Sequence, residues 1–91
     1  MTLSKNKVKE FKAMAQTIQP KVLVGKNGLN DGTVQSIDEV LQADELAKIK
    51  FLNNSIDLDD EICSALATRL GAEFIQKIGR TIILYRKNED Q

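Results

Sequence analysis

Apolar residues recur every three or four positions in three segments of the chain, and this is the spacing of an amphipathic helix. The segments cover about residues 4–17, about residues 31–43 and a stretch that ends at Leu70, just before Gly71. Their apolar positions are Val8, Phe11, Ala15 and Ile18, then Val34, Ile37 and Leu41, then Leu58, Ile62, Leu66 and Leu70. The residues predicted to open these helices, because their side chains can cap a helix, are Ser4, then Asn30 or Asp31, then Ser55 or Asp57.

Shorter apolar stretches between these segments have the character of β-strands. Residues 21–24 contain an uninterrupted apolar run, which predicts a central strand that is buried on both faces. Residues 46–51 alternate instead, with apolar residues on one face and Lys48 and Lys50 on the other. Because successive side chains of a strand point to opposite faces, this second stretch predicts a strand with one face in contact with water.

The last two apolar stretches, residues 74–78 and 81–86, are separated only by Gly79 and Arg80, which predicts a hairpin. The order of elements is then α-β-α-β-α-β-β. Helices that alternate with strands imply crossovers and parallel pairing, and the hairpin adds an antiparallel pair. The sequence therefore predicts one compact α/β domain, a four-stranded mixed sheet with packed helices, followed by a frayed tail over about residues 87–91.

The composition narrows the class of protein. The 91 residues suffice for a single domain over residues 1–91, and the 42% of hydrophobic residues suffice for a globular core. Cys63 is the only cysteine, which excludes an intrachain disulfide and a cysteine metal cluster, and it is predicted to be a small core residue. The chain has no histidine, so it has no Cys–His catalytic pair. Without an apolar run that could span a membrane or serve as a signal peptide, we expect a cytoplasmic protein.

Charge is distributed unevenly along the chain, although the formal net charge is zero. Residues 1–26 carry six lysines and one glutamate, a net charge of +5, whereas residues 27–47 carry five acidic residues and no basic one, a net charge of −5. Lys5, Lys9 and Lys12 fall within about 60° of one another on a helix and form a basic stripe. This asymmetry favours an anionic partner. The other interpretation is that the two regions attract each other within the fold.

The stretch "VGKNGLND" contains two glycines, Gly25 and Gly28, where a predicted strand is followed by a helix. Glycine permits a left-handed backbone and close approach of another molecule. Lys26 adds a positive charge, Asn27 adds donors and acceptors, and the N-terminus of the next helix favours an anion. A glycine-x-x-glycine loop of this kind clamps the nucleic-acid backbone in KH domains. The alternative is a plain strand-to-helix connection. The loop lacks the glycine spacing and the Lys-Ser/Thr pair of a Walker A motif, so nucleotide hydrolysis is not predicted.

Three further groups of residues have two interpretations each. Tyr85 either stacks on a base or packs against the sheet. Arg86 and Lys87 either extend the basic surface or end a strand in solvent. A cluster of carboxylates suits a metal ion, but it also lies where the dipole of the third helix favours acids. The cluster consists of Asp57, Asp59, Asp60 and Glu61.

Two motifs resemble the signatures of a known family. "KVLVGKNGLNDG" resembles the first signature of the CRM (chloroplast RNA splicing and ribosome maturation) domain, and "IGRTIILYRK" resembles the second. The opening stretch "LSKNKVKEFKAMAQTIQPKVLVGKNGL" is similar to the bacterial single-domain YhbY family. The resemblance implies RNA binding, association with precursors of the large ribosomal subunit, and a fold similar to the C-terminal domain of translation initiation factor three. It places the signatures on Gly25, Lys26, Asn27 and Gly28, and on Gly79, Leu84, Tyr85 and Arg86.

The leading hypothesis is thus a non-enzymatic RNA-binding protein that assists ribosome assembly and binds ribosomal RNA of the large-subunit precursor. No cofactor, metal ion, membrane or small-molecule substrate is expected. Asn30 stands where the family pattern suggests threonine, and it caps a helix at least as well. The alternative is a protein-interaction module that uses the acidic second helix, whose Asp31, Asp38 and Glu39 also lie near the predicted phosphate site. The predicted RNA-binding residues are Gly25, Lys26, Asn27, Gly28, Lys5, Lys9, Lys12, Tyr85, Arg86 and Lys87.

Overall fold

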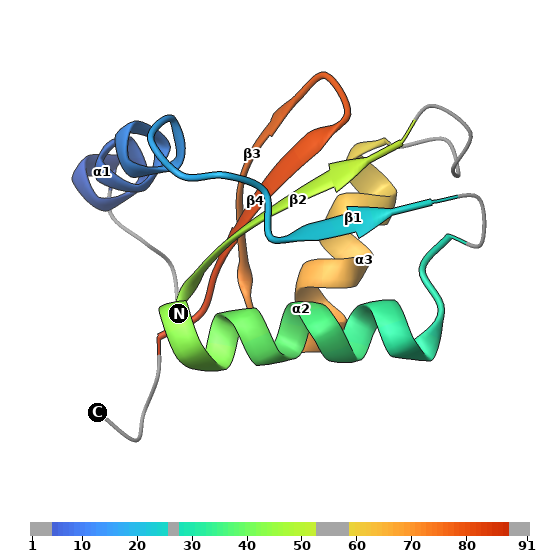
Figure 1. Cartoon of the computed structure of the whole chain (residues 1–91). Helices are drawn as coiled ribbons and strands as arrows, with labels where there is room; N and C mark the ends of the chain where they lie inside the picture. The colour runs from blue at the N-terminus through green and yellow to red at the C-terminus, as the bar shows by residue number, and fades with distance from the viewer. Residues whose placement is uncertain (1–4, 26–27, 53–58, 88–91) are drawn as a thin grey trace.

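Four strands form one sheet in the order β1-β2-β4-β3, and helices pack on both of its faces (Figure 1). The computed structural model describes residues 5–25, 28–52 and 59–87. Its elements are α1 (Lys5–Ala15), β1 (Val22–Val24), α2 (Asp31–Asp44), β2 (Leu46–Phe51), α3 (Asp60–Leu70), β3 (Glu73–Ile78) and β4 (Thr81–Tyr85). β1 pairs with β2 in parallel, while β4 pairs antiparallel with both β2 and β3. The predicted element order and the mixed four-stranded sheet are confirmed.

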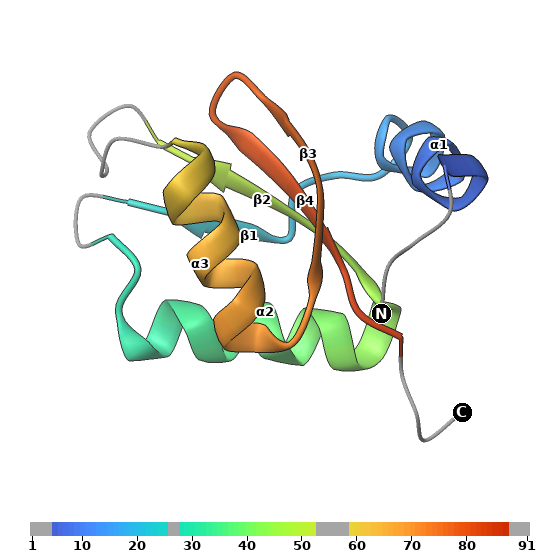
Figure 2. The same ribbon diagram turned by 180° about the vertical axis from the view of Figure 1, so that it is seen from behind.

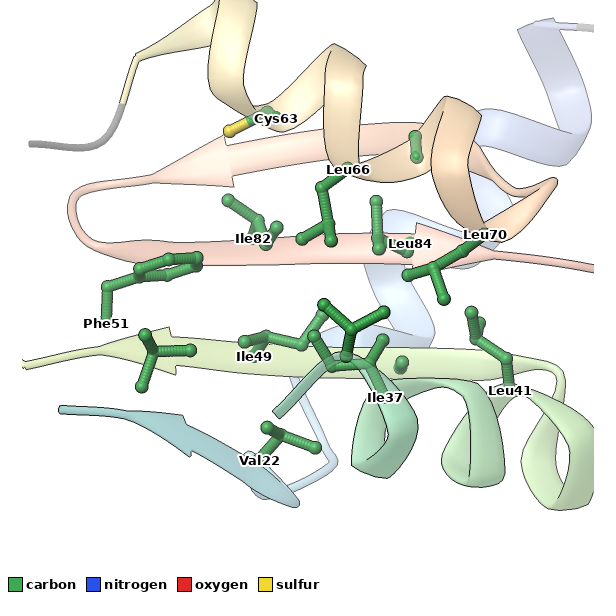
Figure 3. Close-up of a cluster of buried hydrophobic side chains, with 14 residues drawn as sticks. Val22, Ile37, Leu41, Ile49, Phe51, Cys63, Leu66, Leu70, Ile82 and Leu84 are labelled. Atoms are coloured by element: carbon green, nitrogen blue, oxygen red, sulfur yellow. The ribbon is translucent and has the colours of Figure 1, made fainter. Parts of the chain in front are cut away.

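The main core lies between one face of the sheet and the helices α2 and α3 (Figure 3). The sheet contributes alternate side chains of β1, β2 and β4, and α2 contributes the three residues that its spacing predicts. In α3 the predicted Leu66 and Leu70 are buried, Ile62 is only half-buried, and Leu58 lies outside the described residues. Cys63 is completely buried, as predicted for a core residue, and burial raises the pKa of its thiol.

The opposite face of the sheet is partly covered by α1. A smaller cluster there consists of Ala15 from α1, Leu46, Ile75 and Ile83 from the strands, and the half-buried Val8, Phe11, Ile18 and Tyr85. The prediction that this face of β2 meets water is therefore correct only at one end. Lys50 is exposed, whereas Lys48 is half-buried beside α1 and Leu46 is buried beneath it. Alternation placed these side chains on one face but contained no information about which helix covers it.

The prediction of β1 as a central strand is wrong. β1 is an edge strand, and the middle residue of its apolar run, Leu23, is 59% exposed. Val22 and Val24 face the main core, so only one side of the strand is covered. A run of three apolar residues is compatible with either arrangement, because the strand order depends on pairing with distant residues.

Side-chain caps define the starts of two helices. Asn30, one of the two predicted candidates, is the N-cap of α2, and its Oδ1 accepts a hydrogen bond from the Thr33 N–H at 2.9 Å. α3 begins later than predicted, because the Asp59 carboxylate accepts from the Ile62 N–H at 2.8 Å and fixes the start at Asp60. The predicted first residues Ser55 and Asp57, like the Ser4 cap of α1, lie outside the described residues.

Lys48 fastens the end of α1 to the sheet. Its Nζ donates to the carbonyl oxygens of Ala15 at 3.0 Å and Ile18 at 3.2 Å. The last carbonyls of a helix have no partner within the helix, and a positive charge there also complements the helix dipole. A lysine on β2 therefore supplies the contacts that the C-terminal end of α1 lacks.

We expect Lys48→Met to lower the free energy of unfolding by about 1–2 kcal/mol, because it keeps the aliphatic stem and removes two hydrogen bonds from a charged donor. Urea unfolding followed by circular dichroism measures the change. Lys50→Met is the matched control, since Lys50 is exposed on the same strand face and its loss should matter by less than about 0.5 kcal/mol. Equal midpoints for the two variants would mean that Lys48 does not hold α1.

Candidate nucleic-acid interface

The loop between β1 and α2 is closed by a hydrogen bond between its two glycines. The Gly28 N–H donates to the Gly25 carbonyl oxygen at 2.9 Å, and the Gly28 carbonyl accepts from the Asn30 N–H at 3.1 Å. Gly28 is buried and has a φ of 68°, in the left-handed region that only glycine adopts readily. Lys26 and Asn27, the two residues between the glycines, lie outside the described residues. Gly28 is thus required by the backbone of the turn.

Gly25 has no such structural requirement. Its φ lies outside the left-handed region, and a Cβ added there would meet the Leu52 Cδ1 at 4.0 Å, an ordinary van der Waals contact. The residue is partly exposed at the C-terminal end of β1. The fold therefore accommodates alanine at position 25, whereas it disfavours any side chain at position 28.

The first turn of α2 lies next to this loop and presents polar groups. A shallow hollow of about 330 Å³ lies between β1 and this turn, and its lining includes Lys21, Leu23, Asn30, Thr33 and Ser36. The unsatisfied N–H groups of a helix start and the positive end of its dipole attract anions. The hollow, the Gly25–Gly28 turn and the start of α2 together form a polar region suited to a phosphate group.

The lysine stripe, Lys5, Lys9 and Lys12, lies on α1. Val8, Phe11 and Ala15 turn one side of this helix toward the sheet, so Lys5 and Lys9 are exposed and Lys12 is half-buried. Within the described part of the chain none of the three forms an ion pair. Figures 1 and 2 show α1 on one side of the molecule and the C-terminal end of β1 on the other. Gly25 follows that end of the strand. The stripe and the loop therefore lie on separate parts of the molecule.

Three of the four acids of α2 have cationic partners within the fold, and the fourth, Glu39, is exposed. Asp44 pairs with Lys21, Asp31 with Arg69 at 3.2 Å, and Asp38 with Arg86 at 2.7 Å. The predicted attraction between the basic and acidic regions thus holds for Lys21 but not for the lysine stripe. Asp31 has an almost fully exposed side chain, so its pair contributes little stability.

Tyr85 packs against α1. Its ring stacks on the ring of Phe11 with a centroid distance of 4.1 Å and an interplanar angle of 21°. Burial, and then the negative charge of Glu45, raises the pKa of the phenol. One face of the ring is therefore covered. Packing, one of the two predicted roles, is what the structure shows, and base stacking by Tyr85 stays a prediction.

Arg86 occupies the junction of three elements. Its Nη1 donates to the Asp38 carboxylate at 2.7 Å and to the Leu70 carbonyl oxygen at 2.9 Å. Its Nη2 donates to the Asp38 carbonyl oxygen at 3.2 Å and reaches the Gln42 Oε1 at 3.5 Å. Only 19% of the side chain is exposed. RNA contact by Arg86 stays a prediction, while these bonds give the guanidinium a role in joining β4 to α2 and α3.

The remaining residues of the closing motif lie in the core, in the hairpin turn and in solvent. Leu84 is fully buried in the main core, Gly79 lies in the hairpin turn, and Lys87 is exposed beyond β4.

Of the acidic cluster, Asp59 caps α3 and Asp60 pairs with Lys77 at 3.5 Å. The part of the chain that the structure describes contains no group of three or more potential metal ligands. It also contains no helix that is long and apolar enough to cross a membrane.

A four-stranded sheet, a helix with a lysine stripe and a glycine-x-x-glycine turn before a second helix are features of nucleic-acid-binding domains. The family model of the CRS1 / YhbY (CRM) domain matches residues 3–86, and the chain belongs to this family. The resemblance found in the two signature motifs is thus confirmed.

Named relatives agree with this assignment. The chain is 34% identical over 85 residues to "Probable RNA-binding protein YqeI" of Bacillus subtilis, covering 92% of this chain and 88% of that protein. It is 33% identical over 91 residues to an "RNA-binding protein" of Haemophilus influenzae, covering 99% and 92%. The solution structure of protein SAV1595 from Staphylococcus aureus superimposes with a TM-score of 0.80 at 30% identity, covering 97% of this chain and 92% of that one.

Proposed function

We propose that this chain binds RNA through two regions, the Gly25–Gly28 turn with the start of α2 and the lysine stripe of α1. We further propose that its target is ribosomal RNA of the large-subunit precursor and that it assists ribosome assembly in the cytoplasm. RNA binding is supported by the names of the relatives. The ribosomal target is supported by the similarity of the opening stretch, "LSKNKVKEFKAMAQTIQPKVLVGKNGL", to the bacterial YhbY family.

The observation that carries the proposal is the glycine at position 25. Neither backbone conformation nor packing among the described residues requires it. Glycine at such a position is explained by a ligand that must approach the backbone closely. The neighbouring start of α2 supplies N–H groups and a positive dipole end, which suit the phosphate of that ligand.

The lysine stripe supplies the second region. Its three lysines have no ion-pair partner among the described residues, so their charge is available to phosphates. Contacts of this kind give affinity that falls with salt, and they position a protein without reading the bases. The alternative, a protein interaction through α2, receives less support because Asp31, Asp38 and Asp44 are already paired within the fold.

A pair of alanine variants tests the turn. Gly25→Ala should change the free energy of unfolding by less than about 0.5 kcal/mol. It should weaken binding of large-subunit ribosomal RNA about fivefold or more, the equivalent of one hydrogen bond. Gly28→Ala should instead cost about 1–2 kcal/mol of folding stability, because alanine resists the left-handed backbone. Filter binding and urea unfolding measure the two effects. A folded Gly25→Ala variant with unchanged affinity would show that RNA does not approach this turn closely.

The ribosomal target has a separate test. Sedimentation of a cell lysate through a sucrose gradient should place the chain with particles that contain unprocessed large-subunit RNA. Gly25→Ala should shift it toward the top of the gradient. Recovery of the wild-type chain only at the top, or only with small-subunit particles, would refute the assembly role while leaving RNA binding itself intact.

A further inference from the structure

The face of the sheet that carries α1 is open beyond the end of that helix. Register partners place Leu23 of β1 beside Lys50 of β2, Lys50 beside Thr81 of β4, and Thr81 beside Ile78 of β3. These four side chains therefore form one row across the whole sheet, which we call the cross-sheet row. Leu23 is 59% exposed, Ile78 is 57% exposed, and Lys50 is also exposed. Two large apolar side chains are thus exposed to water at the two ends of the row, with Lys50 and Thr81 between them.

The charge of this surface is positive. Within the described residues Lys50 forms no ion pair. On the strands, the described acid on this face is Glu73, which pairs in register with Tyr85 at the end that α1 covers. Lys12 of the lysine stripe lies at the other border of the open face. An anionic partner is therefore favoured over a basic or neutral one.

A small hollow lies where the cross-sheet row meets α1. It has a volume of about 140 Å³ and an apolar lining that includes Ala15, Ile78 and Ile83, with Lys12 and Lys48 also in its wall. Sites for drug-sized ligands have about 300–1,000 Å³, so this one is too small for a whole cofactor. Its size and lining suit one flat ring that belongs to a longer chain whose charge contacts the lysines.

The position of the row also connects the two regions of the proposed RNA surface. Leu23 is two residues before Gly25 of the turn, and Ile78 lines the same hollow as Lys12. A strand of nucleic acid that contacts both regions would cross the row between them. Base pairs hide the apolar faces of the bases, whereas unpaired nucleotides expose them to side chains and leave their phosphates free for lysine.

We propose, on the basis of the proposed RNA binding, that the cross-sheet row binds unpaired nucleotides of the RNA. Leu23 and Ile78 contact base faces, Lys50 and Lys12 contact phosphates, and the hollow beside α1 holds one base. The ligand is thus single-stranded RNA, or the single-stranded loop of a folded RNA, and not a regular duplex.

The test uses the double variant Leu23→Thr/Ile78→Thr. Threonine suits an exposed strand position, so the fold should be retained. Affinity for a single-stranded oligonucleotide should fall about tenfold or more, because two large apolar side chains that would be buried against base faces are lost. Affinity for duplex RNA of the same length should change less than twofold, and the salt dependence should stay the same, because apolar contacts release no counterions. Met14→Gln, at an exposed apolar position on α1 outside the row, is the control and should bind like wild type.

Amide chemical shifts provide a second readout that does not depend on variants. Titration of the wild-type chain with a single-stranded oligouridine should shift Leu23, Lys50, Thr81 and Ile78, and should leave α3 unchanged. Normal single-strand affinity in the folded double variant would overturn the inference and leave the proposed function standing. Concentration-dependent self-association that the double variant abolishes, without loss of RNA affinity, would assign the face to a second copy of the chain. Absence of RNA binding by the wild type would refute the proposed function itself.

Discussion

Replacing Arg86 with methionine is expected to lower the free energy of unfolding by about 2–4 kcal/mol, because a partly buried ion pair and the hydrogen bonds of the guanidinium to two helices are lost together. The guanidinium donates to Asp38 on α2 and to the carbonyl of Leu70, the last residue of α3. That carbonyl has no partner within its own helix. Methionine keeps much of the side-chain volume, so the change reports on polar contacts more than on packing.

A loss of this size is a large part of the total stability. A 91-residue domain is stabilised by roughly 5–14 kcal/mol at about 0.05–0.15 kcal/mol per residue. Arg86→Lys should lose about half as much as Arg86→Met, since lysine keeps the charge but cannot donate to several acceptors in fixed directions. Lys87→Met, one residue further along and exposed, should change stability by less than about 0.5 kcal/mol. Urea unfolding of the three variants measures these differences.

The same variants separate the two roles that have been considered for Arg86. If its contribution is structural, the folded fraction of Arg86→Met should bind RNA with wild-type affinity once the unfolded fraction is taken into account. Affinity lost in a variant that is as stable as wild type would instead show that Arg86 contacts RNA. Its neighbours on α2 and α3 would then have to release the guanidinium on binding.

Regular elements were predictable because one-sided burial leaves a periodic trace in the sequence. Val34, Ile37 and Leu41 recur at helical spacing since all three face the sheet, and they are buried as expected. The Asn30 cap was predictable for a similar reason, because the contact that defines it spans only three residues. Local contacts of this kind depend on the nearest residues and not on the rest of the fold.

Strand order and the covering of faces were not predictable in the same way. The edge position of β1 follows from the pairing of β2 with β4, which joins residues as far apart as Leu46 and Tyr85. Lys48 was predicted to point away from the core, and it does, but no local pattern indicated that α1 ends above it. The exposure of Leu23 was not predictable for the same reason, since in the sequence an apolar residue of an edge strand looks like one of a central strand.

The candidate site contains residues whose role could be predicted from local sequence and residues whose role depends on distant contacts. The left-handed backbone of Gly28 was predictable from the need of a tight turn for glycine, whereas the absence of any such need at Gly25 appears only in three dimensions. The contacts of Arg86 join parts of the chain that are 16 to 48 residues apart. A strand-end arginine in the sequence therefore gave no indication that two helices converge on it.

The lysine stripe is expected to account for three phosphate contacts, one for each lysine. Each lysine that neutralises a phosphate contributes about 0.7–0.9 to the slope of log affinity against log salt concentration. Replacing Lys5, Lys9 and Lys12 with glutamine should thus flatten that slope by roughly 2–3 units. If the affinities of variant and wild type converge near 1 M salt, the variant should bind about 50–170-fold more weakly at roughly 0.15 M salt. Stability should change little, because within the described residues none of the three lysines forms an ion pair.

Two comparisons make this result specific. Arg69→Gln/Lys77→Gln removes two cations that pair with acids on the face of α2 and α3, and it should leave the slope unchanged. Lys26→Ala in the loop should flatten the slope by about 1 unit. Neither the triple variant nor Lys26→Ala should alter the preference among RNA sequences, because phosphate contacts do not read bases. An unchanged slope in the triple variant would remove α1 from the RNA surface. Binding would then depend on the Gly25–Gly28 turn and the cross-sheet row, whose single exposed lysine predicts a slope near 1 for that row.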